Sequence, residues 1–123
     1  ICPECKALED DASLGHLEAH ISGAAVEKRY GKKPYEITDD KFWDELARLL
    51  AFGLNNTIVH WSPDVVVLGG SMMKKIGIPI DRVKFHLKKI LKIFPELPEI
   101  KKAELGDLGG LHGALYYLKQ VHK

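Results

Sequence analysis

Two cysteines and two histidines near the start of the sequence have the types and spacing to hold a metal ion. Cys2 and Cys5 form a C-x-x-C pair, and His16 and His20 follow on one expected helix. With only two cysteines, so close together, a disulfide framework is excluded, and the pair indicates metal or redox chemistry. The spacing of His16 and His20 predicts that both imidazoles lie on one helix face and reach the same ion. The four residues therefore predict a structural zinc site, with free thiols beside two ordinary helix histidines as the alternative.

A second group of candidate residues closes the apolar run at 64–71, which reads Asp-Val-Val-Val-Leu-Gly-Gly-Ser. β-Branched residues that end at glycine predict a strand buried on both faces, as in a parallel sheet. Glycine has no Cβ, so Gly69 and Gly70 would let a ligand approach the backbone closely. In open α/β sheets, ligands lie beyond the carboxyl ends of the strands. We therefore expect a phosphate or nucleotide beside Gly69, Gly70 and Ser71, unless the glycines serve only to reverse the chain.

The elements that must position these residues alternate between helix and strand, which indicates a helix-rich α/β fold with a few strands. Ser22 is expected to cap one helix that Gly31 ends, and Thr38 or Asp39 to cap the longest helix. Asp81 is expected to cap a later helix. The expected helices cover 16–21, 23–30, 39–60, 81–94 and 111–121, and the expected strands cover 64–68 and 99–105.

The remaining side chains of these helices have ordinary packing roles in this interpretation. Gly113 and Ala114 are small and predict a close approach of the last helix to neighbouring backbone, and Asp107 is expected to cap that helix. His86 is expected to be isolated. Four aromatic residues are expected to pack in the core rather than to stack on bases: Phe42, Trp43, Phe52 and Trp61.

Length and composition bound the chain to one soluble domain and disfavour some partners. It has 123 residues, a net charge of +1 and no apolar run long enough to span a bilayer. The lysines between 84 and 102 alternate with apolar residues at helical spacing, which favours a solvated helix face over a nucleic-acid patch. The sequence begins Ile-Cys-Pro, without a signal peptide or a methionine. We expect a cytoplasmic protein, and a chain cut from a longer one.

Three segments carry motifs in a consistent order. Residues 15–23 read Gly-His-Leu-Glu-Ala-His-Ile-Ser-Gly, residues 63–70 read Pro-Asp-Val-Val-Val-Leu-Gly-Gly, and residues 105–114 read Leu-Gly-Asp-Leu-Gly-Gly-Leu-His-Gly-Ala. Together they resemble the ROK family (repressor, open reading frame, kinase), whose segments are Gly-Cys-Leu-Glu-Ala-(Tyr)-x-Ser-Gly, Pro-x-x-Ile-Val-Leu-Gly-Gly and Leu-Gly-x-x-Ala-Gly-x-x-Gly-Ala. The resemblance covers nearly the whole chain. It implies the carboxyl-terminal part of an actin-like, ribonuclease-H-like ATPase domain.

The resemblance implies roles for residues already singled out. Glu18 matches the glutamate that hydrogen-bonds sugar hydroxyls, and Gly69 and Gly70 match glycines beside the nucleotide. His16 stands where zinc-binding members of the family have their third cysteine, and the fourth ligand would be an upstream histidine or His20. The C-x-x-C spacing departs from the tighter cysteine pair of the family.

The single domain, 1–123, then has two expected parts. Residues 1–22 form a zinc knuckle and a sugar-side helix, and residues 23–123 form the nucleotide-side α/β part. A two-Cys, two-His finger that reads DNA is disfavoured, because the spacer is short and Glu18 and Ala19 lie between the histidines instead of basic residues.

The leading interpretation is the carboxyl-terminal part of an ATP-dependent sugar kinase, with a hexose, glucose expected, as the acceptor and ATP with Mg²⁺ as the donor. Phosphoryl transfer needs a base on the acceptor hydroxyl. No aspartate here matches the catalytic base of the family, so this part is not expected to catalyse by itself.

Two other functions stay open: the effector-binding part of a sugar-responsive transcriptional repressor, and a zinc-stabilised interaction module. Neither a membrane nor a nucleic acid is expected as a partner. Apolar surfaces that would face a missing half of the protein predict a homo-oligomer.

Overall fold

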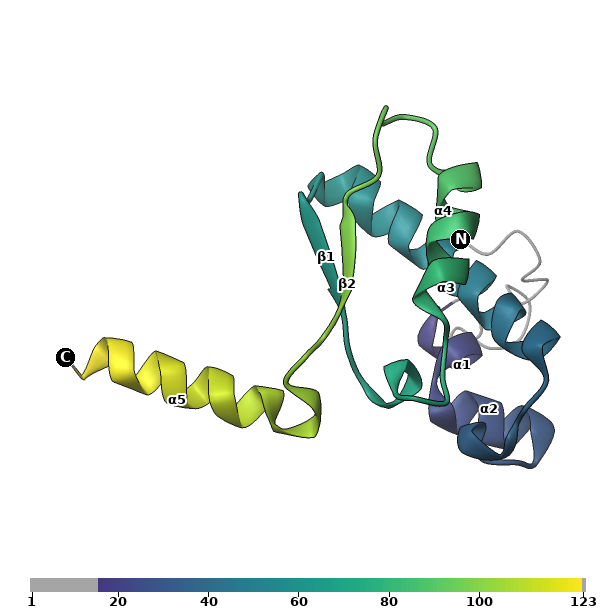
Figure 1. Ribbon diagram of the computed structural model, residues 1–123, viewed down its shortest axis with the longest axis horizontal. Coiled ribbons are helices and arrows are strands. Elements are labelled where there is room, and N and C mark those ends of the chain that lie inside the picture. Colours follow the sequence, from purple (N-terminus) through teal and green to yellow (C-terminus); the bar gives the residue numbers. More distant parts are fainter. Residues whose placement is uncertain (1–15, 123) are drawn as a thin grey trace.

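One long helix and two short strands organise the part of the chain that the computed structural model describes, residues 16–122. Figure 1 shows most of the helices gathered beside a small sheet, and the last helix extending away from it. The elements, in order, are α1 (Glu18–Ile21), α2 (Gly23–Tyr30), η2 (Pro34–Glu36), α3 (Asp40–Trp61), β1 (Val65–Leu68), η3 (Ser71–Met73), α4 (Ile80–Ile90), β2 (Glu99–Lys102), η4 (Gly106–Leu108) and α5 (Gly109–Val121).

Helices α2 and α3 begin at the caps expected from the sequence. Ser22 Oγ accepts a hydrogen bond of 3.1 Å from the amide of Ala25, and Gly31 ends α2 with a φ of 65°. Asp39 Oδ1 accepts a hydrogen bond of 3.0 Å from the amide of Lys41 at the start of α3. The caps satisfy amides that a helix leaves without a partner, so local chemistry decides both starts.

The two strands are parallel, and Val65 pairs with Glu99. Helices α3 and α4 cover one face of the pair, where Leu68 and Ile100 are buried. Val65 and Val67 point to the other face and are 45% and 60% exposed. The prediction of a strand buried on both faces is therefore wrong, because within residues 16–122 no element covers the second face.

The core lies between α3, α4 and the covered face of the sheet. Ala47 and Ala51 of α3 are fully buried, and their small side chains leave room for α4. Val83 and Leu87 of α4 are fully buried in the same core. The packing of α4 on α3 holds the connection between β1 and β2 in place, as in a βαβ unit.

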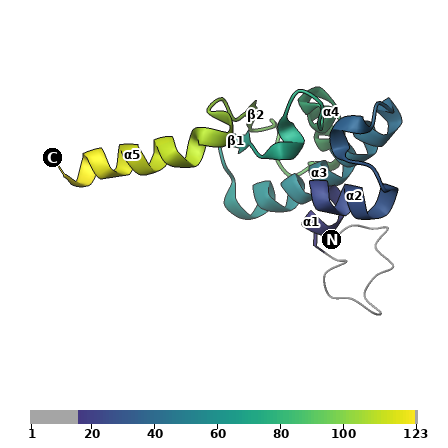
Figure 2. The ribbon, with the colours of Figure 1, turned by 90° about the horizontal axis from the view of Figure 1, so that it is seen from below.

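Helix α5 lies apart from this core. Figures 1 and 2 show it extending away from the end of the sheet, and it has no buried residue. Leu111, at its start, is 69% exposed. An added Cβ at Gly113 would meet no described atom of another element within 4 Å, so the expected close approach to neighbouring backbone is wrong.

Three expected helix starts differ from those observed. Helix α1 begins at Glu18, so His16 precedes it. Pro79 takes the cap position of α4, and Asp81 lies inside its first turn. Asp107 makes no cap to α5; its Oδ2 lies 3.0 Å from Lys74 Nζ in an ion pair. The two aspartates that were expected to cap α4 and α5 therefore do not, because Pro79 and Leu108 take the cap positions.

The aromatic residues of α3 differ in how far they are buried. Trp43 is buried, and its Nε1 donates a hydrogen bond of 2.9 Å to the carbonyl of Ile37. Trp61, at the other end of the helix, is 80% exposed, so its expected place in the core is wrong. Ile58, about one turn earlier, is still buried, so the core ends within the last turn of α3. Among the described residues, no helix has the length and apolarity to cross a membrane.

Candidate functional site

One open pocket of about 580 Å³ joins the start of α1 and α2 to the turn that follows β1. Glu18 lies on one side of it, and Gly69, Gly70 and Ser71 lie on the other. Segments that are about fifty residues apart in the sequence thus share one cavity. Its lining comprises Leu17, Glu18, Ile21, Ser22, Gly23, Leu50, Leu68, Gly69, Gly70, Ser71, Met72, Met73 and Ile78.

The turn after β1 has its shape because of its two glycines. An added Cβ at Gly69 would lie 3.3 Å from the Cβ of Ala103, on the segment that continues β2. Gly70 has a φ of 98°, a conformation that side chains disfavour. The Gly70 carbonyl then accepts a hydrogen bond of 3.1 Å from the amide of Met73, which closes η3. The turn therefore presents backbone, with no side chain at two positions, to the pocket.

Glu18 reaches the pocket from a helix of only four residues. Its carbonyl accepts a hydrogen bond of 3.1 Å from the amide of Ser22, the residue that caps α2. The pocket therefore meets α1 and the first turn of α2 together. Within residues 16–122, no hydrogen bond or ion pair engages the Glu18 carboxylate, so it can accept hydrogen bonds from a ligand.

Most of the other lining is apolar. Leu68, Met73 and Ile78 belong to the core and close the inner end of the pocket, and Met72 lies beside them. Ser22 and Ser71 add hydroxyl groups at the rim. A pocket with an apolar floor and a few polar groups at its edge suits a ligand that has both a flat apolar part and hydroxyl groups.

Comparison with models of protein families shows which family the chain belongs to. The sequence matches the model of the ROK family over residues 13–121. The chain belongs to the ROK family. A search of curated proteins found no match. The family match spans both sides of the pocket, the Glu18 segment and the turn after β1.

The candidate metal ligands of this ROK chain lie only partly within the described residues. Cys2 and Cys5 lie outside them. His16 is exposed and precedes α1, the helix that carries His20, and its carbonyl accepts a hydrogen bond of 3.0 Å from the amide of Ala19. His20 Nδ1 lies 3.2 Å from a guanidinium nitrogen of Arg29. Within residues 16–122, no three potential ligands gather around one point.

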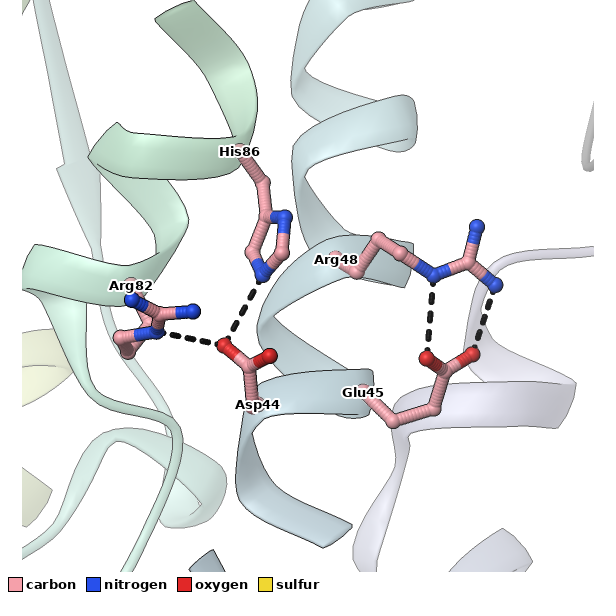
Figure 3. A network of polar contacts seen from close by, with 5 residues as sticks. All are labelled: Asp44, Glu45, Arg48, Arg82 and His86. Atoms are coloured by element: carbon pink, nitrogen blue, oxygen red, sulfur yellow. Dashed lines mark hydrogen bonds and ion pairs between the residues drawn. The ribbon is translucent and has the colours of Figure 1, made fainter. Parts of the chain in front are cut away.

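A polar network that sequence reasoning missed joins α3 to α4 on another side of the ROK chain (Figure 3). Asp44 Oδ1 accepts a hydrogen bond of 2.6 Å from Arg82 Nε and lies 2.9 Å from His86 Nε2. These contacts, that with Arg82 first, lower the pKa of Asp44 to about 2. The prediction that His86 is isolated is therefore wrong. Next to this network, Arg48 holds Glu45 through two hydrogen bonds and lowers the pKa of that carboxyl.

Sequence signals for this network are weak. Arg82 and His86 are four residues apart and share one face of α4, but the acid that they meet lies about forty residues earlier on α3. None of the five residues drawn in Figure 3 lines the pocket. We assign the network to the packing of α3 on α4.

Proposed function

We propose that the pocket is the sugar and nucleotide site of a ROK-type sugar kinase, in which Glu18 binds a hexose, glucose as the expected one, and Gly69, Gly70 and Ser71 bind the nucleotide. In this proposal the domain is the carboxyl-terminal part of an actin-like ATPase fold. The observation that supports it is the shared pocket, because a kinase must hold both substrates within reach of each other. Its volume is in the range of small-molecule sites.

Each side of the pocket has chemistry that suits its proposed ligand. A carboxylate accepts hydrogen bonds from two neighbouring hydroxyls of a sugar, and such charge-assisted bonds are the stronger ones. On the other side, backbone amides and the Ser71 hydroxyl can meet the polar part of a nucleotide. The apolar floor at Met72 and Ile78 suits the flat face of a base.

Phosphoryl transfer needs a base on the acceptor hydroxyl as well as ATP and Mg²⁺. No aspartate lines the pocket among the described residues. We therefore give the residues of this chain binding and orienting roles, and we assign none of them to proton transfer. Mg²⁺ would come with ATP and neutralise its phosphates.

The second candidate function is the sugar-binding part of a ROK-type transcriptional repressor. It requires the Glu18 side of the pocket and no nucleotide. This function also needs no aspartate as a base, and the described lining contains none. The two functions differ in a simple measurement, because a repressor part binds the sugar alone, whereas a kinase part also binds ADP.

We test the site by titrating the 123-residue chain with glucose and with ADP, using calorimetry. Glu18→Ala should weaken glucose binding about ten-fold or more, since it removes a charged hydrogen-bond acceptor. Glu27→Ala is the matched control, because Glu27 is exposed on α2 and does not line the pocket. Equal glucose affinity in the Glu18 variant and the wild type would remove Glu18 from the site.

We also propose a structural zinc ion held by Cys2, Cys5, His16 and His20. Two thiolates and two imidazoles are a donor set that zinc accepts in four-coordinate sites. The exposed position of His16 leaves its ring open to an ion. A zinc ion at either ring nitrogen of His20 would break the contact with Arg29, because the guanidinium only donates and a neutral imidazole has a single acceptor nitrogen. The zinc would fix the chain just before Glu18. A zinc-stabilised interaction module with no nucleotide affinity is the corresponding alternative function.

For the assembly, we propose a homo-oligomer in which α5 of one copy packs on a second copy. Helix α5 has no acid and one lysine, Lys119, and its large apolar side chains are more than half exposed. Apolar surface of this kind favours association.

A further inference from the structure

A glycine in the middle of the longest helix has a packing role that sequence motifs do not mark. Gly53 lies inside α3, where glycine is less favourable than alanine. An added Cβ at Gly53 would overlap Leu17 Cδ2 and would lie 3.3 Å from both Cδ1 and Cγ of Leu17. The side chain of Leu17 therefore occupies the space that any larger residue at position 53 would need.

Leu17 connects this contact to the pocket. It takes the cap position of α1, directly before Glu18, and its carbonyl accepts hydrogen bonds from the amides of His20 and Ile21 at 3.0 and 3.1 Å. Leu17 also lines the pocket. A helix of four residues cannot hold its position by its own hydrogen bonds. The contact between Leu17 and Gly53 therefore determines how close α1 lies to α3.

We infer that Gly53 is a positioning residue for Glu18: the absence of a side chain at position 53 lets Leu17 seat against α3, and this sets the place of Glu18 in the pocket. The sugar-binding part of this inference rests on the proposed function. A rotation about χ2 of Leu17 cannot by itself relieve Gly53→Ala fully, because Cγ of Leu17, which that rotation does not move, is itself close. Either α1 moves away from α3, or the side chain of Leu17 turns into the pocket.

The experiment compares Gly53→Ala with Gly113→Ala, which also replaces a glycine inside a helix but meets no described neighbour. The first readout is amide hydrogen exchange at Ile21 and Ser22, whose amides bond to the carbonyls of Leu17 and Glu18. Gly53→Ala should speed their exchange about ten-fold and weaken glucose binding about five-fold or more. Gly113→Ala should change neither and should raise the melting temperature slightly.

A double-mutant cycle separates positioning from a general loss of structure. Leu17→Ala removes the side chain that Gly53 accommodates and leaves space that a Cβ at position 53 can fill. Adding Gly53→Ala should therefore lower the melting temperature of the wild type but raise that of the Leu17→Ala variant. Additive effects with the same sign in both backgrounds would overturn the inference.

The outcomes distinguish this inference from the proposed function. A wild-type chain that binds neither glucose nor ADP would refute the proposed function, whereas exchange at Ile21 and Ser22 and the cycle would still decide the role of Gly53. Glucose binding that is equal in the wild type and Gly53→Ala, or unchanged exchange at those two amides, would overturn the positioning role and leave the site standing.

Discussion

Asp44 is the residue through which α3 holds two side chains of α4. Its folded-state pKa of about 2 lies below the ordinary value of 3.8. An acid whose pKa is lowered by folding adds stability that is fully present above its unfolded pKa. This stability is lost as the pH falls through the folded pKa. The contribution of Asp44 should therefore disappear between about pH 4 and pH 2.

Asp44→Asn tests this link. Because the ion pair with Arg82 is partly exposed to solvent, we expect the variant to lower the free energy of unfolding by about 1 kcal/mol at neutral pH. The difference from the wild type should shrink as the pH falls from 4 to 2. Urea unfolding at several pH values measures both. A constant difference across that range would show that Asp44 acts through packing and not through its charge.

Sequence motifs predicted Glu18, Gly69 and Gly70 as residues of one binding site, and the structure places all three around one pocket. Their ligands remain predictions. The motifs contained no signal for Asp44 or Gly53, because the partners of both lie far away in the sequence and contact them only after folding. The spacing of caps and apolar residues carries no information on such contacts.

Among the elements, α1 depends most on its surroundings. It has four residues and no buried one, so its stability has to come from contacts such as that of Leu17 with Gly53 of α3. Helices α2 and α3 could be predicted from their caps, because Ser22 and Asp39 act on the nearest amides. The cover of β1 could not be predicted, since Val65 and Val67 have the composition of a buried strand whether or not another layer is present.

The proposed zinc gives a test at the scale of this element. Removing the metal with a chelator, or replacing Cys2 and Cys5 together by serine, should lower the melting temperature, because metal binding contributes to folding. Elemental analysis should find one zinc per chain in the wild type and none in the variant. The control combines Lys6→Ser with Lys28→Ser, which also introduces two serines but leaves the four proposed ligands unchanged. A wild-type chain purified without chelator that contains no zinc would contradict the assignment.

For the whole molecule, the main feature is apolar surface on α5 and on the open face of the sheet. The sequence motifs predicted the α/β character and the family. They did not predict that α5 lies apart from the core, because its apolar spacing is that of a packed helix. Patches of this kind drive association.

Light scattering across a range of concentrations measures the proposed assembly. The wild-type chain should be a dimer or larger, and Leu115→Glu should shift it to a monomer because it places a charge on the exposed apolar face of α5. Ile93→Glu is the matched control, since Ile93 is also an exposed aliphatic residue but follows α4. A wild-type chain that stays monomeric at high concentration would refute the assembly, and would leave α5 to a different protein partner.

The contact of Gly53 with Leu17 links the thermal tolerance of the chain to its binding of a ligand. Engineers who seek heat resistance routinely exchange glycines inside helices for alanine, and such exchanges usually cost no function. If Gly53 seats Leu17 as inferred, a library ranked by thermal tolerance would reject alanine there and accept it at Gly113. A variant that combines Gly53→Ala with Leu17→Ala should rank above Leu17→Ala alone in such a library and still bind glucose less tightly than the wild type.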